Sequence, residues 1–334
     1  MDLSIICVNW NSVNYLRECV ASIYEHTRDV AFEIIVVDNA SPEGGVDVLK
    51  QQFPDIILIK SGENLGFAGA NNLGFKQSKG KCILFLNPDT KLLNPAINIM
   101  LRELQSLPGA GIIGCKLLNG DLWVQTSSIM KFPGILNQVL QSEVLRLHWP
   151  SFPLWNISPL FSNSAEPAKV EVITGACMMM RREIFEKVGM FSEEYFMYAE
   201  DVDLCWKITR AGFSNYYVGE GNIVHYGGVS SPREWQIVMK MRAELRLCAN
   251  FRGRFYGLLF RSVLALNAAI RLFVAAVLSL FRKGGRSKEG PNITLIKYRA
   301  VLKTLLTPSG NNLHPPSARG SNPLPLAKNE RTAH

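Results

Sequence analysis

The chain has 334 residues, of which 47% are hydrophobic and 19% are charged. This composition excludes a largely disordered chain and is typical of one large α/β domain with an appendage. The seven cysteines are scattered and never form a C-x-x-C pair, which argues against a disulfide framework and a structural zinc site and leads us to expect a reducing compartment. A strand is predicted from residue 3 onward, so we expect no signal peptide.

Charge is distributed unevenly along the chain. Residues 251–334 carry 14 Lys and Arg against two acids, a net of +12. The overall charge is +8, so residues 1–250 carry a net −4. An acidic body with a basic, apolar tail favours an anionic membrane surface as partner and disfavours nucleic acid.

Strands and helices alternate over the first 90 residues. Apolar runs predict buried strands at residues 3–8, 32–37, 56–59 and 83–86, and helical spacing predicts a helix at 13–26. Two strands joined by one helix form a parallel, right-handed βαβ unit. The strand ends carrying Asn9, Asp38 and Asp89 should therefore meet at one edge of the sheet, together with the segment from Asn64 to Asn72.

The glycine-rich segment after the third predicted strand leads into a helix and invites comparison with the dinucleotide-binding fingerprint. It reads Gly62-x-x-x-Gly66-x-x-Gly69, which lacks the G-x-G-x-x-G spacing and disfavours an NAD-binding fold. Its small residues either let the backbone approach a phosphate or sugar, or allow tight packing of helix on sheet. The residues leave both interpretations open.

The fourth predicted strand ends at Asn87-Pro88-Asp89-Thr90. Pro88 removes a backbone donor and ends the strand, so that Asp89 lies on the following loop, where its carboxylate could hold a divalent cation. An ordinary turn is the alternative, because Asn, Pro and Asp all favour turns.

The pattern is looser between residues 108 and 175. Residues 111–117 are predicted to form an edge strand, and Trp123, Trp149 and Trp155 follow among several prolines. These aromatic side chains either line an acceptor site or cover the core, and we favour the core.

Three carboxylates, Glu200, Asp201 and Asp203, fall in the first turn of a helix predicted from residue 200 to Gly212. Acids are favourable at a helix N-terminus, but three within four residues exceed what a cap requires and repel one another, which points to a binding site. A strand at residues 213–218 and a lone His225 beside two glycines follow.

Seven motifs occur in one order along residues 1–235. They are Ile6 to Asn11, Val36 to Ser41, Asn64 to Asn72, Leu86 to Thr90, Thr174-Gly175-Ala176, Glu200-Asp201-Val202-Asp203-Leu204 and His225-Tyr226-Gly227-Gly228. Together they resemble glycosyltransferase family 2, particularly its bacterial rhamnosyltransferase-like branch. The chain departs from the family's usual Asp-x-Asp metal motif by carrying Asn87 at the first acidic position.

The resemblance implies a GT-A fold, an α/β architecture with a mostly parallel central sheet and helices on both faces. We expect a catalytic domain at residues 1–250, with a nucleotide-sugar-binding half at 1–107 and an acceptor and catalytic half at 108–250. A basic, apolar, membrane-associating helical region at 251–307 and a disordered tail at 308–334 would follow.

The resemblance also implies site roles. Asp201 matches the catalytic base, and Glu200 or Asp203 would bind the acceptor. Asp89 and His225 would hold Mg²⁺ or Mn²⁺. The nucleotide-sugar-binding residues would be Asn9, Asp38, Asn64, Gly66, Asn72, Asn87 and Asp89.

The implied reaction is inverting transfer of L-rhamnose from dTDP-rhamnose to a glycan acceptor, joined to a polyprenyl diphosphate, during synthesis of a cell-surface polysaccharide. Transfer from another nucleotide-hexose, with UDP or GDP, is the alternative. A nucleotidyltransferase would need a basic, glycine-rich triphosphate loop, which Asn9-Trp10-Asn11 does not supply. A non-catalytic carbohydrate-binding protein would have no reason to keep Asp89, Asp201 and His225 together.

The basic tail contains two apolar stretches, residues 255–281 and 293–306. Arg261, Asn267 and Arg271 interrupt the first, so we expect an interfacial segment at the cytoplasmic face of the plasma membrane, bound peripherally. A helical subdomain packed on the catalytic core is the alternative, because interfacial and core helices share one periodicity.

Overall fold

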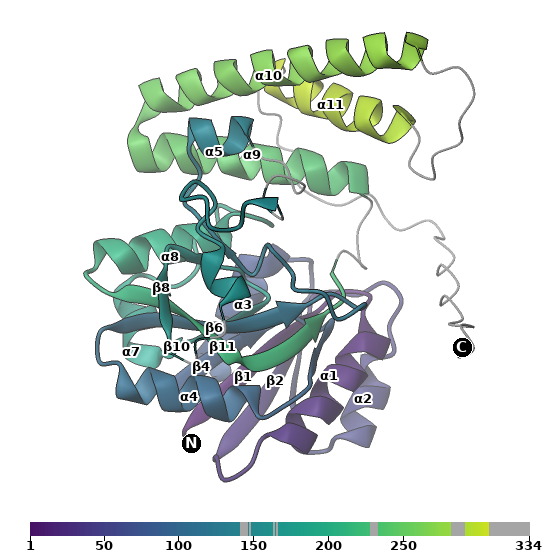
Figure 1. The fold of residues 1–334 in the computed structure, drawn as a ribbon. Helices are drawn as coiled ribbons and strands as arrows, with labels where there is room; N and C mark the ends of the chain where they lie inside the picture. The colour runs from purple at the N-terminus through teal and green to yellow at the C-terminus, as the bar shows by residue number, and fades with distance from the viewer. Residues whose placement is uncertain are drawn as a thin grey trace, which may run out of the picture.

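The computed structural model describes residues 1–140, 146, 148–162, 164, 166–227, 233–281 and 291–306. It contains an α/β body with a layer of helices on one side (Figure 1). The predicted disordered tail, residues 308–334, lies outside the described residues.

The first half of the body contains the predicted βαβ units. Its elements are β1 (Leu3–Asn9), α1 (Val13–His26), β2 (Phe32–Asp38), α2 (Val46–Gln52), β3 (Ile57–Lys60), α3 (Gly66–Gln77) and β4 (Cys82–Leu86). The four strands are parallel and lie in the order β3-β2-β1-β4. The carboxyl ends of β1, β2 and β4 therefore lie along one edge of the sheet, as expected from the sequence.

The second half of the body extends the same sheet. Its elements are β5 (Thr90–Leu92), α4 (Ala96–Ser106), β6 (Ala110–Leu118), β7 (Ile129–Met130), α5 (Ile135–Val139), the 3-10 helix η1 (Ser158–Phe161), β8 (Ala168–Val170), β9 (Val172–Ile173), β10 (Cys177–Arg181), α7 (Arg182–Lys187), α8 (Glu200–Arg210) and β11 (Ser214–His225). The sheet order is β3-β2-β1-β4-β10-β6-β11-β5, with β8 paired to β11, while β7 and β9 form a separate pair. Six of the nine strands in the large sheet, β1 to β4, β6 and β11, run in one direction. The mostly parallel sheet predicted from the sequence is confirmed.

The prediction that residues 111–117 form an edge strand is wrong. They belong to β6, which lies inside the sheet between β10 and β11. The antiparallel strand β10 inserts between β4 and β6 and contributes the fully buried Met178, Met179 and Met180. Pairing between segments so distant in sequence cannot be inferred from the local pattern of β6.

Helices cover both faces of the sheet. Along β4, Ile83 and Phe85 face the layer that contains α3, α7 and α8, whereas Leu84 and Leu86 face α1, α2 and α4. Phe85 packs against the rings of Phe185 and Phe191 at centroid distances of 4.9 and 4.8 Å. Fully burying one such side chain contributes roughly 1.5–3 kcal/mol, so both faces anchor β4 in the centre of the body.

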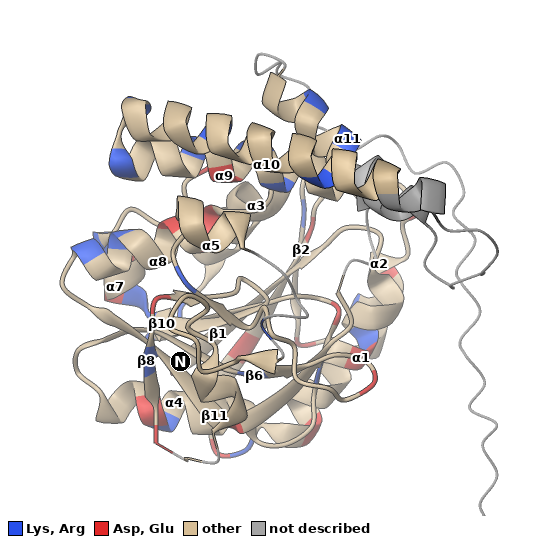
Figure 2. Ribbon diagram, turned by 45° about the horizontal axis from the view of Figure 1, so that its top comes forward, with Lys and Arg blue, Asp and Glu red and all other residues tan. Residues whose placement is uncertain are grey.

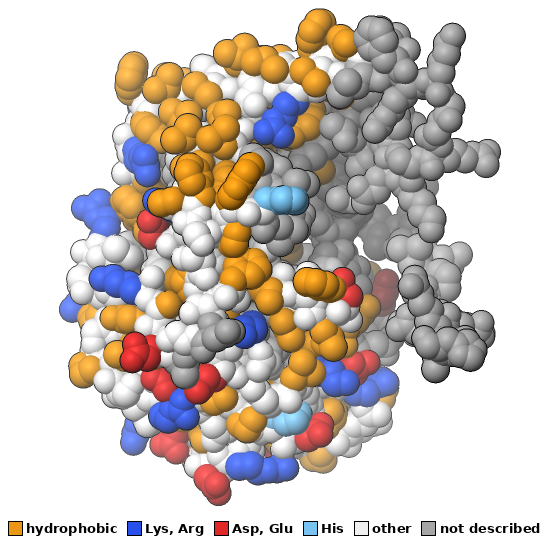
Figure 3. Space-filling view, in the orientation of Figure 1, with side chains coloured by type: hydrophobic (Ala, Val, Ile, Leu, Met, Phe, Trp, Pro, Cys, Tyr) orange, Lys and Arg blue, Asp and Glu red, His pale blue; other side chains and the backbone are white. Residues whose placement is uncertain are grey.

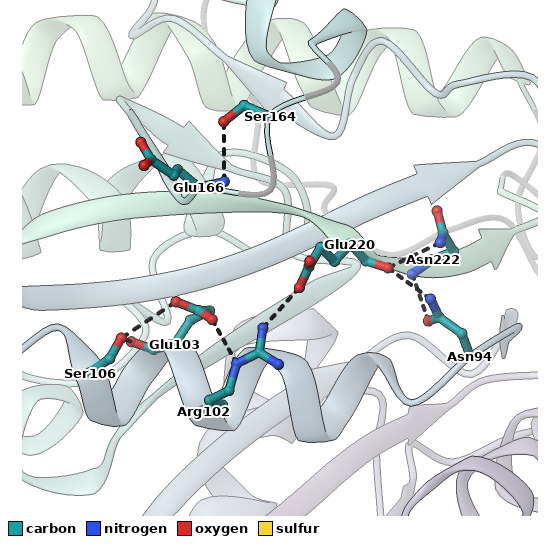
Figure 4. Close-up of polar contacts among 8 residues, drawn as sticks. All are labelled: Asn94, Arg102, Glu103, Ser106, Ser164, Glu166, Glu220 and Asn222. Atoms are coloured by element: carbon teal, nitrogen blue, oxygen red, sulfur yellow. Dashed lines mark hydrogen bonds and ion pairs between the residues drawn. The ribbon is translucent and has the colours of Figure 1, made fainter.

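A bulge divides β11 into two segments. Its pairing with β6 shifts register between Val218 and Asn222. Asn94, just before α4, donates from Nδ2 to the carbonyl of Glu220 at 2.7 Å and accepts the Asn222 N–H at Oδ1 at 2.9 Å (Figure 4). Arg102 of α4 also bonds the Glu220 carboxylate at 2.8 Å. These contacts direct the end of β11 toward β5, where His225 pairs with Thr90.

The C-terminal layer contains α9 (Arg233–Arg252), α10 (Arg254–Phe281) and α11 (Pro291–Leu306). Helix α9 packs on the body through Ala243 and Leu247, which belong to the core on the α8 side of the sheet. Helices α9, α10 and α11 share a second apolar cluster. Its buried members are Cys248, Phe260, Leu264, Ala268, Val301 and Leu305. The layer is thus a packed helical subdomain that begins at Arg233, and the predicted boundary at residue 250 falls inside α9.

The polar residues that interrupt α10 lie on its inner side. Arg261 donates to the carbonyl of Leu305 at 2.6 Å, and Arg271 donates to the Tyr298 hydroxyl and the Val139 carbonyl, both at 2.8 Å. Because these two arginines point inward, the outer side of α10 remains largely apolar. The ribbon coloured by charge shows α10 as largely uncharged (Figure 2). Its exposed large apolar side chains are Phe255, Leu258, Leu259, Leu266, Ile270, Phe273 and Val274.

Apolar side chains gather on the surface over this layer (Figure 3). Within the described residues, one segment, Arg254–Val277 of α10, is long and apolar enough to cross a membrane by length and composition alone, with a mean hydropathy of 1.7.

Among the tryptophans, Trp155 is buried, as expected for a core residue, whereas Trp123 and Trp149 are 75% and 63% exposed, so the core interpretation is wrong for those two.

The contacts of Asn94 predict its contribution to stability. Asn94→Ala should lower the free energy of unfolding by about 1–2 kcal/mol, because it removes two hydrogen bonds that hold the β11 bulge. Arg102→Ala is the matched control, and it should cost less than about 0.5 kcal/mol because its ion pair with Glu220 is exposed. Urea unfolding followed by circular dichroism measures both, and equal losses would contradict the assignment.

Candidate active site

A cleft of about 270 Å³ opens at the carboxyl edge of the sheet. The loops after β1 and β4, the start of α3 and the start of α8 form its walls. The sequence-predicted residues that line it are Asn64, Gly66, Asn87, Asp89, Glu200, Asp201 and His225. Four others, Asn9, Asp38, Asn72 and Asp203, lie behind its surface.

Asp89 and His225 come together in one corner of the cleft. The Asp89 Oδ1 atom lies 3.4 Å from His225 Nε2, and the Asp89 carbonyl accepts the N–H of Tyr226 at 3.0 Å. The side-chain amide of Asn87 lies 3.2 Å from the same imidazole nitrogen. The β5–β11 pairing brings these residues together although about 136 positions separate Asp89 from His225 in the sequence.

Gln125 orients the His225 ring. Its Oε1 atom lies 2.8 Å from His225 Nδ1. An amide oxygen can only accept a hydrogen bond, so this contact assigns a proton to Nδ1, and in the neutral ring Nε2, the nitrogen next to Asp89, is the one that could bind a cation. Metal-binding histidines are commonly held in this way.

The donor set in this corner fits a divalent cation with open coordination positions. One carboxylate oxygen and one imidazole nitrogen face each other, and such mixed ligands suit Mn²⁺ as well as Mg²⁺. No group of three or more His, Cys, Asp or Glu side chains that could hold a metal occurs in the described part of the chain. Most of the coordination sphere would therefore have to come from substrate oxygens and water.

The start of α8 contributes two further carboxyl groups to the lining of the cleft. Tyr198 and Ala199 adopt left-handed backbone conformations with φ of 69° and 67°, and the helix begins at Glu200. Asp201 accepts the N–H of Gly175 at Oδ2 and the N–H of Val202 at Oδ1, both at 2.8 Å. Burial raises the pKa of Asp201, whereas these two N–H groups act to lower it.

Glu200 is more deeply buried than its neighbour. Only 5% of the residue is exposed, and its Oε2 atom has no hydrogen-bond partner among the described residues. Burial raises the pKa of the Glu200 carboxyl well above its usual range, and the nearby charge of Asp201 raises it further. Glu200 therefore keeps its proton to a higher pH than an ordinary glutamate.

Asp203 points away from the cleft although it belongs to the same helical turn. Its Oδ2 atom accepts the Ser192 hydroxyl and lies 3.4 Å from Lys207 Nζ. The three acids of the predicted cluster thus have different surroundings, and only Glu200 and Asp201 line the cleft.

Asn9 and Asp38 form a buried polar cluster under the cleft. Asn9 Nδ2 donates to Asp38 Oδ1 at 2.8 Å, and the Ser41 hydroxyl donates to the same oxygen at 2.6 Å. Asn72 is also buried, and it donates to the Phe191 carbonyl at 3.0 Å. In this structure these three side chains support the loops that bound the cleft.

Gly66 allows two backbone segments to meet. Its φ is +72°, and a Cβ atom at this position would lie 2.1 Å from the carbonyl oxygen of Phe196. The neighbouring Phe67 N–H donates to that same oxygen at 2.9 Å. Gly66 is therefore required where α3 contacts the 194–197 loop, although its position in the cleft wall is also compatible with an approaching ligand.

The sequence interpretation missed two residues that organise the site. Asn39 donates to Asn64 Oδ1 at 2.9 Å and accepts the Leu65 N–H at 2.8 Å, so it holds the loop that precedes α3. Its position directly after Asp38 was the available signal. Gln125 lies between strands without any periodic pattern, so nothing in the sequence marked it.

Comparison with known proteins places this chain in a family. A family model described as Glycosyl transferase family 2 matches residues 4–189. The chain is 27% identical over 245 residues to the N-acetylglucosaminyl-diphospho-decaprenol L-rhamnosyltransferase of Mycobacterium tuberculosis, covering 70% of this chain and 78% of that protein. It is 28% identical to the rhamnosyltransferase WbbL of Escherichia coli (66% and 82% covered) and 30% identical to the low-salt glycan biosynthesis hexosyltransferase Agl10 of Haloferax volcanii (76% and 74% covered).

Solved structures have the same fold at lower identity. The mannosyltransferase PcManGT from Pyrobaculum calidifontis, in complex with GDP-Man and Mn²⁺, matches with a TM-score of 0.54 and 16% identity over 91% of this chain and 85% of that one. GalNAc-T7 with UDP, GalNAc and Mn²⁺ matches with a TM-score of 0.53 and 16% identity over 67% and 43%. The predicted GT-A fold is confirmed, and the chain belongs to glycosyl transferase family 2 and is a glycosyltransferase.

Proposed function

We propose that this chain is an inverting glycosyltransferase that moves L-rhamnose from dTDP-rhamnose to a glycan acceptor carried on a polyprenyl diphosphate, in synthesis of a bacterial cell-surface polysaccharide. The observation that carries the proposal is that Asp201, a half-buried carboxylate, lines the same cleft as the Asp89–His225 pair. The rhamnosyltransferases among the relatives support the sugar, and the decaprenol diphosphate in one relative's name supports the acceptor. The relative named a hexosyltransferase supports another nucleotide-hexose as the alternative donor.

Inversion in one displacement needs a base on the face of the sugar opposite the leaving diphosphate. Asp201 is suited to this role, because burial raises its pKa and makes it a stronger proton acceptor than a solvated aspartate. Its bonds to the N–H groups of Gly175 and Val202 fix its orientation while leaving lone pairs on both oxygens. Asp201 would accept the proton of the acceptor hydroxyl as that hydroxyl attacks the sugar.

Glu200 is the better candidate for holding the acceptor. It lines the cleft beside Asp201, and its raised pKa favours a protonated carboxyl that can donate to a sugar oxygen. Asp203 has intramolecular partners in Ser192 and Lys207 and does not line the cleft. We therefore assign acceptor contact to Glu200 and a supporting role to Asp203.

The corner of the cleft formed by Asp89 and His225, here called the metal corner, would hold the donor diphosphate. A divalent cation held by Asp89 and His225 would supply positive charge to the leaving group. Gln125 keeps His225 in the tautomer that this role needs, and Asn87 lies within hydrogen-bond distance of the same ring nitrogen. Asn64 and Gly66 line the cleft wall where the nucleotide-sugar would lie, above the Asn9–Asp38 cluster.

The outer side of α10 supports a membrane location. Its exposed apolar side chains and the net +12 of residues 251–334 favour the surface of an anionic membrane. All seven cysteines are unpaired, which is compatible with the cytoplasmic face. We propose peripheral attachment at that face, where nucleotide-sugars are available.

Asp201→Asn should lower the rate of transfer by about 10²–10⁴-fold while leaving donor affinity within about twofold, because it removes the base without changing the shape of the side chain. Turnover of a nucleotide-sugar panel with a lipid-linked acceptor, together with calorimetric donor binding, measures both quantities. Asp203→Asn is the matched control, since it neutralises a carboxylate of the same turn that lies outside the cleft. An Asp201→Asn enzyme that kept more than about a tenth of its rate would exclude Asp201 as the base.

Asp89→Ala and His225→Ala should each reduce the enhancement of donor binding by Mn²⁺, because each removes one of two proposed ligands. We expect losses of roughly 10–100-fold in metal-dependent affinity, measured with dTDP-rhamnose in Mn²⁺ and in EDTA. The control is Asp47→Ala, which removes an exposed carboxylate on α2 paired with Lys60. Equal enhancement by Mn²⁺ in wild type and in both cleft variants would exclude these ligands.

Leu266→Ser together with Phe273→Ser should weaken binding to vesicles that contain phosphatidylglycerol. The two side chains are 62% and 70% exposed on α10, so their replacement should leave the fold intact while removing apolar contact with the membrane. We expect the affinity for vesicles, measured by cosedimentation, to fall at least about tenfold. Val48→Ser, an exposed apolar position on α2, is the control; if it lowered binding equally, α10 would not be the membrane-contacting surface.

A further inference from the structure

We infer that a second cavity, beside the active-site cleft, binds the diphosphate of the lipid-linked acceptor. The inference rests on the proposed function, because it gives that acceptor a defined place. The cavity has a volume of about 470 Å³ and lies between the 194–197 loop and helices α9, α10 and α11. Its charged lining consists of four arginines, Arg242, Arg246, Arg254 and Arg261, and one acid, Glu194.

The cavity adjoins the active-site cleft. Phe196 and Met197 line both spaces, so a single loop separates them. The contact between Phe67 and the Phe196 carbonyl fixes this loop against α3. A diphosphate in the cavity would therefore place the sugar attached to it next to the wall that leads to Asp201.

The proposed reaction involves two diphosphates, one in the nucleotide-sugar donor and one in the lipid-linked acceptor. Charge assigns the donor diphosphate to the cleft and the acceptor diphosphate to the second cavity. The cleft is lined by the carboxylates of Asp89 and Asp201, which would repel a second diphosphate after a cation has compensated the first. The arginine-lined cavity carries three more positive charges than negative ones. It matches a diphosphate better than the single phosphate of a common phospholipid, and guanidinium groups bind phosphate oxygens through paired N–H donors.

Two of the arginines are well placed to bind an anion. Arg246 is fixed by donation to the Glu194 carbonyl at 2.6 Å and keeps further N–H groups. Neither Arg246 nor Arg254 forms a salt bridge with a carboxylate in the described part of the chain. Both can therefore pair with an incoming anion without first breaking an ion pair.

The same cavity continues into the apolar outer surface of α10. Leu258 lines the cavity and is 64% exposed, and Phe255 and Leu259 are its exposed neighbours on the helix. A prenyl chain that starts at the arginines could therefore run along α10 into the membrane. Adjacent basic and apolar surfaces are what an amphipathic prenyl diphosphate requires.

The test measures binding of farnesyl diphosphate to the full chain by calorimetry in EDTA, where the proposed metal corner cannot retain a diphosphate. We expect Arg254→Gln and Arg246→Gln each to weaken binding by roughly tenfold or more, as for loss of a charged hydrogen bond, and Arg254→Lys to restore part of it. Arg252→Gln is the matched control, because Arg252 contacts the Tyr256 ring and does not line the cavity. It should change the affinity by less than about twofold.

The possible outcomes separate this inference from the proposed function. Equal affinity in wild type and the arginine variants, or no binding by wild type, would overturn the inference even if sugar transfer is observed. The same arginine variants are also tested for binding to phosphatidylglycerol micelles. If they lose that binding but keep the wild-type affinity for farnesyl diphosphate, the inference is overturned and the cavity is assigned to a phospholipid headgroup. Arginine-dependent binding without transfer from any nucleotide-sugar would support the cavity assignment and overturn the proposed function.

Discussion

The backbone of Gly175 and Ala176 connects the start of α8 with the loop after β4 in the candidate active site. The Gly175 N–H donates to Asp201 at 2.8 Å, and the Ala176 carbonyl accepts the N–H of Asn87 at 3.0 Å. These two residues precede β10, the antiparallel strand that lies between β4 and β6. A shift of β10 by one residue would move both contacts and would also turn its buried methionines to the opposite face. The position of Asp201, the proposed base, relative to the Asp89–His225 pair therefore depends on the register of one strand.

The acidic start of α8 makes the folding stability depend on pH. Burying Glu200 and Asp201 side by side disfavours their charged forms and raises the pKa of both. A carboxyl whose pKa is raised in the folded state contributes stability at low pH. That contribution is lost as the pH rises from the ordinary pKa of an unfolded carboxyl through the raised value of the folded one. At Asp201, part of this loss of stability is offset because the charged carboxylate interacts favourably with the helix N-terminus and accepts the Gly175 N–H.

The distribution of charge organises the molecule at a larger scale. The cleft is lined by carboxylates, whereas the neighbouring cavity is lined mainly by arginines, and the 194–197 loop separates the two. Arg261 and Arg271 of α10 turn inward toward α11 and Val139, so the side of the helix that faces solvent remains largely apolar. This arrangement accounts for both alternatives considered for the tail, because α10 packs as part of a helical subdomain and still presents an apolar surface.

The local pattern of apolar and polar residues in the sequence determined the strands and helices that surround the site. Apolar runs and helical spacing predicted β1, α1, β4 and α8, and the polar residues after each strand identified the edge of the sheet at which the cleft forms. These predictions succeeded because burial imposes a period of two on strands and of 3.6 on helices within a single segment. The order of motifs along the chain was sufficient to indicate the family.

Only the tertiary structure decided which residues share the cleft. The contact of His225 with Asp89 depends on pairing between β5 and β11, and the bulge held by Asn94 directs β11 toward that pairing. Gln125 orients His225 from a segment without periodicity, and Asp203 turns away from the cleft although it lies two residues after Asp201. Such contacts join segments far apart in the chain, or depend on which side of a helix faces the core. Their energies come from packing and hydrogen bonds that form only in the folded chain, so the local pattern does not encode them.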